Sequence, residues 1–179
     1  MNARILFNFV GAAILLAGCT ASVPLEPSKT FKLAGHQVQF SPPAKFELKE
    51  EREAKGKPVV AVVFQTPSKL GHIAVNALDA TNGTEYDKLD KKNLQPFADA
   101  VYKRSGRITA QREVDLLGGK GNGYRMEFEY GDGDTKMCGV QVHVPYQKVL
   151  YSIVMTVPAK ELKDDLPWFE GVVNTFKVQ

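Results

Sequence analysis

Residues 58–66, PVVAVVFQT, are the stretch of the sequence that says most about the fold. They form a continuous apolar run rich in β-branched side chains, a pattern typical of a central strand covered on both faces. Residues 73–78, IAVNAL, follow after a short polar break and predict a second strand. We therefore expect the centre of a β-sheet in this part of the chain.

Shorter segments lie upstream of this centre. Residues 31–33 and 37–40 alternate between apolar and polar side chains around Ala34-Gly35, which predicts a short hairpin. Residues 46–48 predict a small strand, and the charged residues 49–57 predict a turn after it.

Four more strands are predicted downstream, over residues 108–117, 123–130, 135–144 and 148–157. Gly-rich or Pro-containing turns join these strands, and such short turns favour antiparallel pairing of consecutive strands.

A first helical segment is predicted between the two groups of strands. It opens at residues 84–87, TEYD, which fit a capping box. Pro96 either divides the segment into two helices or occupies the first turn of the second. Its apolar residues fall on one helical face: Leu94, Phe97, Ala98, Val101 and Tyr102.

A second helical segment is predicted near the C-terminus, over residues 159–174. Within it, Pro167 is expected to start a new helix capped by Asp164 or Asp165. The apolar residues that recur at helical spacing are Leu162, Leu166, Phe169, Val173 and Phe176. Together the elements predict an α+β fold, a largely antiparallel β-sheet with helices packed on its faces.

The composition is that of an ordinary globular protein of 179 residues, 44% hydrophobic and 24% charged. The formal charge of +3 is dispersed, without a Lys/Arg block, so it gives no argument for a nucleic-acid partner. Two cysteines are too few for a disulfide framework or a Cys-rich zinc module.

The first residues predict export and lipidation. Residues 5–16 form an apolar stretch that is shorter than the ~20 residues of a membrane-spanning helix, as in a signal peptide. The sequence Leu16-Ala17-Gly18-Cys19 resembles the lipobox of bacterial lipoproteins. The resemblance implies cleavage after residues 1–18, a diacylglycerol thioether on Cys19 and acylation of its new amine. The alternative is an ordinary secretory signal with a chance cysteine.

The segment after the lipobox predicts where the domain stands. Residues 19–29 comprise the lipidated cysteine and a Pro-containing tether, and residues 30–179 form the domain. Thr20 follows the cysteine where an aspartate would be the inner-membrane retention signal of Gram-negative lipoproteins. We therefore expect a lipid-anchored protein of the bacterial cell envelope, on the outer membrane and facing the periplasm.

Three patterns in the folded part resemble PsbP-like domains. They are an entry segment at residues 41–46 (SPPAKF), a strand end at residues 114–118 (VDLLG) and a finish at residues 173–178 (VNTFKV). Thr175 stands where that group often has serine. The resemblance covers residues 30–179 and implies a PsbP-like fold. Members of the group look like non-enzymatic accessory or adaptor domains whose partners differ widely, so the fold does not define the function.

No set of residues predicts a catalytic, metal or cofactor site. Cys138 shares strand parity with Val140, Val142 and Val144, which predicts a buried, inert thiol. A pairing of Cys138 with His143 is disfavoured because an odd spacing in a strand places the two on opposite faces. His36 and His72 do not have the spacing of metal ligands with any other histidine.

Three residues are candidate partner contacts. The Gly-rich residues 118–123 fit a hairpin loop better than a phosphate-binding loop. Lys120 lies in this loop and Arg125 follows it, and both are candidates for contact with a partner. Trp168 lies ~100° around the helix from Phe169 and either packs or contacts a partner, with packing preferred.

The leading hypothesis for the function follows from the anchor and the resemblance. It is a lipid-anchored, non-enzymatic envelope protein that acts as an accessory or adaptor domain for a protein or an envelope component. Its partners would be the membrane, through Cys19, and a protein not yet identified. The alternative is a periplasmic carrier that holds a small apolar ligand between sheet and helix.

Overall fold

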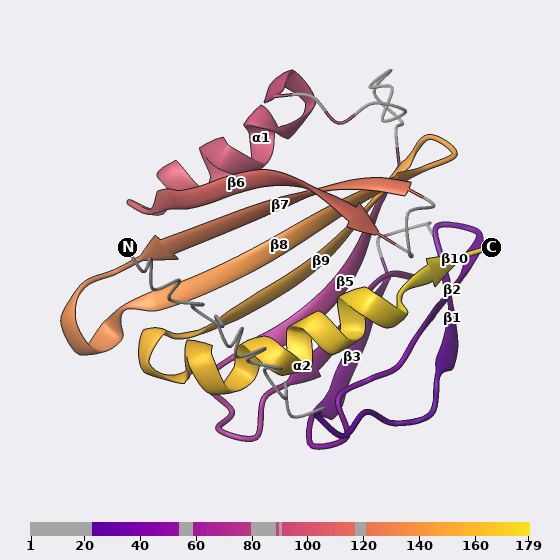
Figure 1. The fold of residues 1–179 in the computed structure, drawn as a ribbon, viewed down its shortest axis with the longest axis horizontal. Coiled ribbons are helices and arrows are strands. Elements are labelled where there is room, and N and C mark those ends of the chain that lie inside the picture. Colours follow the sequence, from indigo (N-terminus) through magenta and orange to yellow (C-terminus); the bar gives the residue numbers. More distant parts are fainter. Residues whose placement is uncertain (1–22, 54–58, 80–88, 90, 117–120) are drawn as a thin grey trace, which may run out of the picture.

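The computed structural model describes residues 23–53, 59–79, 89, 91–116 and 121–179 (Figure 1). Residues 1–22, which include the predicted signal peptide and Cys19, lie outside the described residues, as do the capping box at residues 84–87 and Lys120.

Seven antiparallel strands form the larger sheet, in the order β3-β4-β5-β9-β8-β7-β6. Their bounds are β3 (Glu47–Glu53), β4 (Val59–Gln65), β5 (His72–Asp79), β6 (Arg107–Leu116), β7 (Gly121–Tyr130), β8 (Met137–Tyr146) and β9 (Val149–Pro158). The predicted apolar run becomes β4, one strand in from the edge, and its residues 61–64 are buried. The predicted antiparallel α+β architecture is confirmed.

A second sheet of three strands joins the two ends of the described chain. It consists of β1 (Lys29–Leu33), β2 (His36–Phe40) and the short β10 (Lys177–Val178), with β2 in the middle. The predicted hairpin is present: Ala34 and Gly35 form its turn with φ of 49° and 89°, the left-handed conformations that two-residue hairpin turns require.

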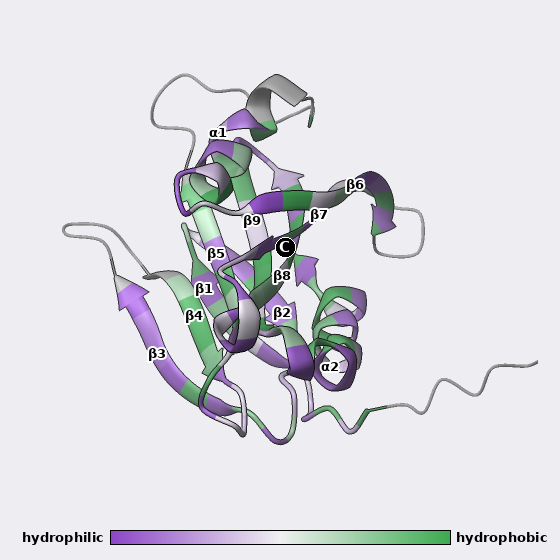
Figure 2. Cartoon of the chain, turned by 90° about the vertical axis from the view of Figure 1, so that its left-hand side faces the viewer, coloured by the Kyte–Doolittle hydropathy of each residue, from purple (hydrophilic) through white to green (hydrophobic). Residues whose placement is uncertain are grey.

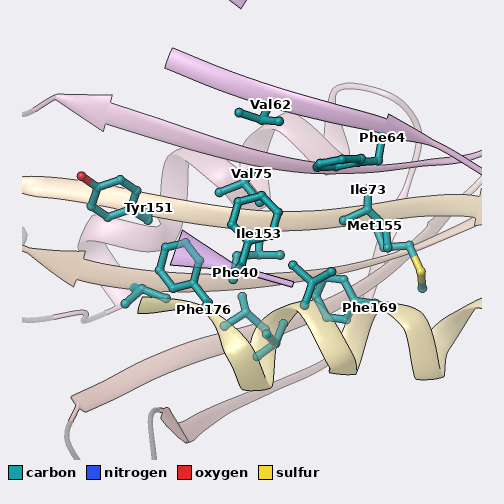
Figure 3. Close-up of a cluster of buried hydrophobic side chains, with 14 of the residues drawn as sticks. Phe40, Val62, Phe64, Ile73, Val75, Tyr151, Ile153, Met155, Phe169 and Phe176 are labelled. Carbon is teal, nitrogen blue, oxygen red and sulfur yellow. The ribbon is translucent and has the colours of Figure 1, made fainter. Parts of the chain in front are cut away.

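The helix α2 (Leu162–Thr175) and the small sheet cover one face of the larger sheet (Figure 1). The core between these layers is filled by large side chains, as Figure 3 shows around Phe40, Phe169 and Phe176. Phe40 also meets Phe64 of β4 edge to face at 5.9 Å, which joins the small sheet to the large one.

The helix α1 (Lys91–Tyr102) lies on the other face of the larger sheet, over β6 and β7 (Figure 1). It is one helix with Pro96 inside it, so neither predicted arrangement of that proline is found. Leu94, Ala98 and Val101 of the predicted apolar face are buried, whereas Tyr102 is exposed.

The predicted turn at residues 49–57 is wrong over its first part, because β3 continues to Glu53. This strand is the edge of the sheet, where charged side chains and bulges are the usual protection against pairing with another chain. Both devices are present, since β3 has register shifts at residues 48–50 and 52–53 and appears hydrophilic beside apolar β4 in Figure 2.

The predicted helix start at Pro167 is also wrong. The 3-10 turn η2 (Ala159–Glu161) leads directly into α2, and Glu161 is the N-cap residue, without a side-chain cap. Pro167 lies inside the helix, where the missing N–H costs ~3 kcal/mol. Burial of the apolar side of the helix offsets that cost. Of the predicted apolar residues, Phe169, Val173 and Phe176 are buried, and Leu162 and Leu166 pack against the core. The buried residues of the helix also include Trp168 and Val172, so the stripe is wider than predicted.

Candidate functional site

Two adjoining hollows lie on the face of the larger sheet away from α2. One, of about 340 Å³, lies over β3, β4, β5 and the β4–β5 turn. The other, of about 330 Å³, extends toward Phe97 of α1 and Gln141 of β8. Both are lined by Arg52 and Asn76, so the two hollows adjoin each other, and together we call them the groove.

Small side chains form the floor of the groove. Side chains of a strand alternate between the two faces, so Ala61 and Val63 of β4 point into the groove while Val62 and Phe64 point into the core. Ala74 and Asn76 of β5 are their cross-strand partners. Because the side chains of the floor are short, the longer side chains at the margin of the groove extend above them.

A row of polar side chains crosses the floor at right angles to the strands. Asn76, Ser152 and His143 are successive cross-strand partners on β5, β9 and β8. The Ser152 hydroxyl lies 2.8 Å from Nδ1 of His143, and the Gln141 amide nitrogen donates to the same hydroxyl at 3.0 Å. The Asn76 amide also donates to the Ser152 carbonyl at 3.4 Å.

One protonation pattern accounts for both hydrogen bonds of the Ser152 hydroxyl. If Ser152 accepts from Gln141 and donates to His143, Nδ1 of the imidazole is the acceptor and Nε2 carries the proton. Nε2 has no hydrogen-bond partner among the residues that the structure describes, and the ring of Phe97 lies 4.3 Å from the imidazole, centroid to centroid. Complete burial lowers the pKa of His143 from its ordinary 6.5 to about 3, so the ring is neutral at physiological pH.

Ser152 and His143 have the atoms of a nucleophile and a base, but not their arrangement. Ser152 is 2% exposed, and no carboxylate orients the imidazole through Nε2. The described residues contain no group of three His, Cys, Asp or Glu side chains placed to hold a metal ion. The row therefore serves to pair polar groups across a sheet and to present amide and hydroxyl groups to the groove.

The half of the groove over β3 and the β4–β5 turn is basic. Lys49, Arg52, Lys69 and His72 line it, and no Asp or Glu is among the described residues of this lining. Arg52 pairs with Glu50 at 2.6 Å on the exposed side of β3. Desolvation and the neighbouring Arg52 charge lower the pKa of His72, so this imidazole is neutral at pH 7 and the lysines carry the positive charge.

Arg125, a predicted partner contact, lies on the opposite face and is buried. Its guanidinium donates to Glu170 of α2 at 2.6 Å and to Glu127 at 2.8 Å, and it lies 5.9 Å above the centre of the Phe169 ring. The two carboxylates raise its pKa against the effect of desolvation. This burial favours a role in fixing α2 to β7 over the predicted contact with a partner.

Trp168 is also buried, with 8% of its surface exposed. Its ring lies 5.8 Å from that of Phe46, which supports the packing interpretation over a partner contact. Lys120, the third candidate, lies outside the described residues.

Cys138 differs in part from the prediction. It lies on the face of Val140 and Val142 but at the end of β8, where it is half-buried rather than enclosed. Desolvation and the nearby Glu129 raise the pKa of its thiol, so little of the reactive thiolate is present near neutral pH.

The groove residues were not predicted as a site. Asn76, Gln141 and Ser152 are polar residues within strands that are otherwise apolar, and this is the signal that marks them in the sequence. Their convergence depends on the pairing of β5 with β9, which no spacing within one strand reveals.

No helix among the described residues is long and apolar enough to span a membrane. This statement applies to residues 23–53, 59–79, 89, 91–116 and 121–179.

No protein-family model and no curated protein matches the sequence. Solved structures of similar fold do exist. Cyanobacterial PsbP (CyanoP) from Synechocystis sp. PCC 6803 aligns over 91% of this chain and 99% of its own, with a TM-score of 0.60 and 15% identity. LpqN, involved in cell envelope biogenesis of Mycobacterium tuberculosis, aligns over 86% and 91%, with a TM-score of 0.54 and 10% identity. At these identities the likeness concerns the fold, and the chain has the PsbP-like α+β fold that its sequence patterns predicted.

Proposed function

We propose that this chain is a non-enzymatic accessory domain, anchored by a lipid on Cys19 at the bacterial envelope, that binds an envelope component or a protein along the groove. The observation that carries the proposal is the groove itself. It is a depression on a sheet face that α2 leaves uncovered, with polar groups on its floor and positive charge at one end.

The lipid anchor and the location rest on the lipobox, residues 16–19, and on Thr20 after it. A protein of similar fold, LpqN, is described as involved in cell envelope biogenesis, which agrees with an envelope location. On this proposal the domain stands at the outer membrane and faces the periplasm.

A binding role fits the groove better than catalysis. His143, beneath the groove, is buried and neutral, and Ser152 in its floor is already engaged in hydrogen bonds. A carrier of a small apolar ligand, the alternative, would need space between sheet and helix. On the α2 side, Phe40, Phe169 and Phe176 fill that space.

The anchor is tested by Cys19→Ser in the full chain, expressed in a bacterium with labelled fatty acid. We expect complete loss of the label and a precursor that keeps residues 1–18, because the thiol is the atom that receives the lipid. Cys138→Ser removes the other cysteine of the sequence and is the matched control, which should keep the label. Label retained by Cys19→Ser, or absent from the unaltered chain, would contradict the proposal.

Binding along the groove is tested in intact cells with a photo-reactive residue at position 78. Leu78 is 39% exposed and lines the groove, so a probe there leaves the core intact. The control probe replaces Lys163, an exposed residue of α2 on the other face. We expect adducts at position 78 alone, abolished by Asn76→Lys, which fills the floor. Identical adducts from both probes, or none from either, would show that the groove is not a binding surface.

A further inference from the structure

The basic end of the groove has a second feature, a tight turn that presents a lysine and a leucine to solvent. The turn between β4 and β5 places Lys69 at a φ of 62° and leaves Leu70 60% exposed, the most exposed large apolar side chain among the described residues. Hydrogen bonds hold the turn in this shape. Thr66 and Gly71 exchange backbone and side-chain bonds at 3.0–3.1 Å, and the Gln65 amide donates to the Lys69 carbonyl.

Cationic side chains surround this leucine. Lys69 is in the same turn, and Lys49 and Arg52 lie across the groove on β3. One carboxylate, Glu161, touches the turn and is occupied by a hydrogen bond from Ser68 at 2.7 Å. Among the described residues, Lys49 and Lys69 form no ion pair, whereas Arg52 is paired with Glu50. A rigid tip that combines an exposed apolar side chain with such ammonium groups has the chemistry of a contact with anionic headgroups.

The position of the turn agrees with this chemistry. In Figures 1 and 2 the β4–β5 turn and the start of the described chain lie at the same end of the molecule, opposite α1. Three residues lie between Cys19 and Val23, where the described chain begins, so four residue-to-residue steps join the two (23 − 19 = 4). Even when fully extended they span at most about 14 Å. Part of the predicted tether is held on the domain, because Leu25 forms a β-bridge with Pro43 and the Glu26 N–H donates to the Pro42 carbonyl at 2.8 Å. A lipid on Cys19 therefore keeps this end of the domain close to the bilayer.

We propose that the β4–β5 turn and the basic end of the groove dock on the membrane that holds the anchor, with Lys49 and Lys69 at the phosphates of anionic phospholipids and Leu70 among the headgroups. The inference rests on the proposed anchor and deepens the proposed function, because it names the envelope component that occupies this end of the groove. Docking would fix the orientation of the domain and leave the end of the groove near Phe97 open for a partner.

The test uses the lipidated full chain reconstituted in vesicles of phosphatidylcholine, with or without phosphatidylglycerol. Amide hydrogen exchange of residues 66–72 is the readout, because docking shields this turn whereas the anchor alone does not. Two lysines at an anionic surface contribute about 2 kcal/mol to the free energy of docking. We therefore expect roughly thirty-fold slower exchange in vesicles with phosphatidylglycerol than in vesicles without it.

Two double variants separate a specific contact from a general effect of charge. Lys49→Gln with Lys69→Gln should remove the protection. Lys103→Gln with Arg104→Gln makes the same charge change at exposed positions after α1 and should leave it intact. Equal exchange in the two vesicle types, or equal loss of protection in both variants, would overturn the inference while the anchor stands. Recovery of the unaltered chain in the vesicle-free fraction would overturn the anchor, and the inference with it.

Discussion

Replacement of Phe169 by alanine is expected to lower the free energy of unfolding by about 3–5 kcal/mol, a large part of the 5–15 kcal/mol typical of a domain. Phe169 has no exposed surface and lies between α2 and the larger sheet, as Figure 3 shows. The substitution would leave a cavity in the core. It would also remove the ring beneath the Arg125 guanidinium. This buried charge depends on contacts with its neighbours to offset the cost of its desolvation.

Denaturant unfolding of the purified variants measures this effect. Phe169→Leu retains most of the volume and should cost much less, which keeps the comparison informative if the alanine variant does not fold. Leu48→Ala is the control, because Leu48 is 47% exposed on β3 and its loss should change the free energy of unfolding by less than about 0.5 kcal/mol. Equal stabilities of Phe169→Ala and Leu48→Ala would contradict the packing of α2 on the sheet.

Acidification is expected to destabilise the domain through His143. The unfolded chain binds a proton at this residue near pH 6.5, whereas burial lowers the pKa in the folded state to about 3. The unfolded state therefore binds more protons between these values, and stability is lost as the pH falls through this window. The loss is about 1.4 kcal/mol per pH unit, or about 3 kcal/mol at pH ~4 and about 4 kcal/mol at pH ~3.

The variant His143→Gln isolates this contribution. A glutamine can still accept from Ser152 but does not titrate, so its free energy of unfolding should fall less between pH ~7 and pH ~4. His36→Gln is the control, since His36 lies at the β1–β2 turn and is partly exposed. An unchanged pH dependence in His143→Gln would show that the buried imidazole is not the group responsible.

Most strands could be predicted because their apolar patterns are local. The run at residues 58–66 and the four later segments could be predicted as strands from the spacing of their apolar residues and from the turn residues beside them. The edge strand β3 was predicted only at its start, residues 46–48, because its charged residues 49–53 have no continuous apolar pattern and resemble a turn. Only its pairing with β4 makes it a strand.

The site was harder to predict than the fold because it is assembled across strands. Ser152 lies in one of the most buried strands of the sheet, and nothing in its own segment distinguishes a core hydroxyl from the floor of a groove. Arg125 was misplaced for the same reason. As a charged residue beside a glycine-rich loop it resembled a surface contact, whereas Glu170, 45 positions away, supplies the carboxylate that permits its burial.

The pairing of β10 with β2 has a consequence for how the chain reaches its native state. Val178 lies opposite Val38, so the contact spans 140 positions (178 − 38 = 140) and closes nearly the whole described chain into a ring. Contacts of such long range form late, because the loop-closure entropy has to be overcome first. A chain that emerges with its N-terminus first would therefore keep β2 without its second neighbour until the final residues appear. During that interval the apolar side chains of the first hairpin, Phe31 and Phe40, would depend on other proteins for protection from aggregation.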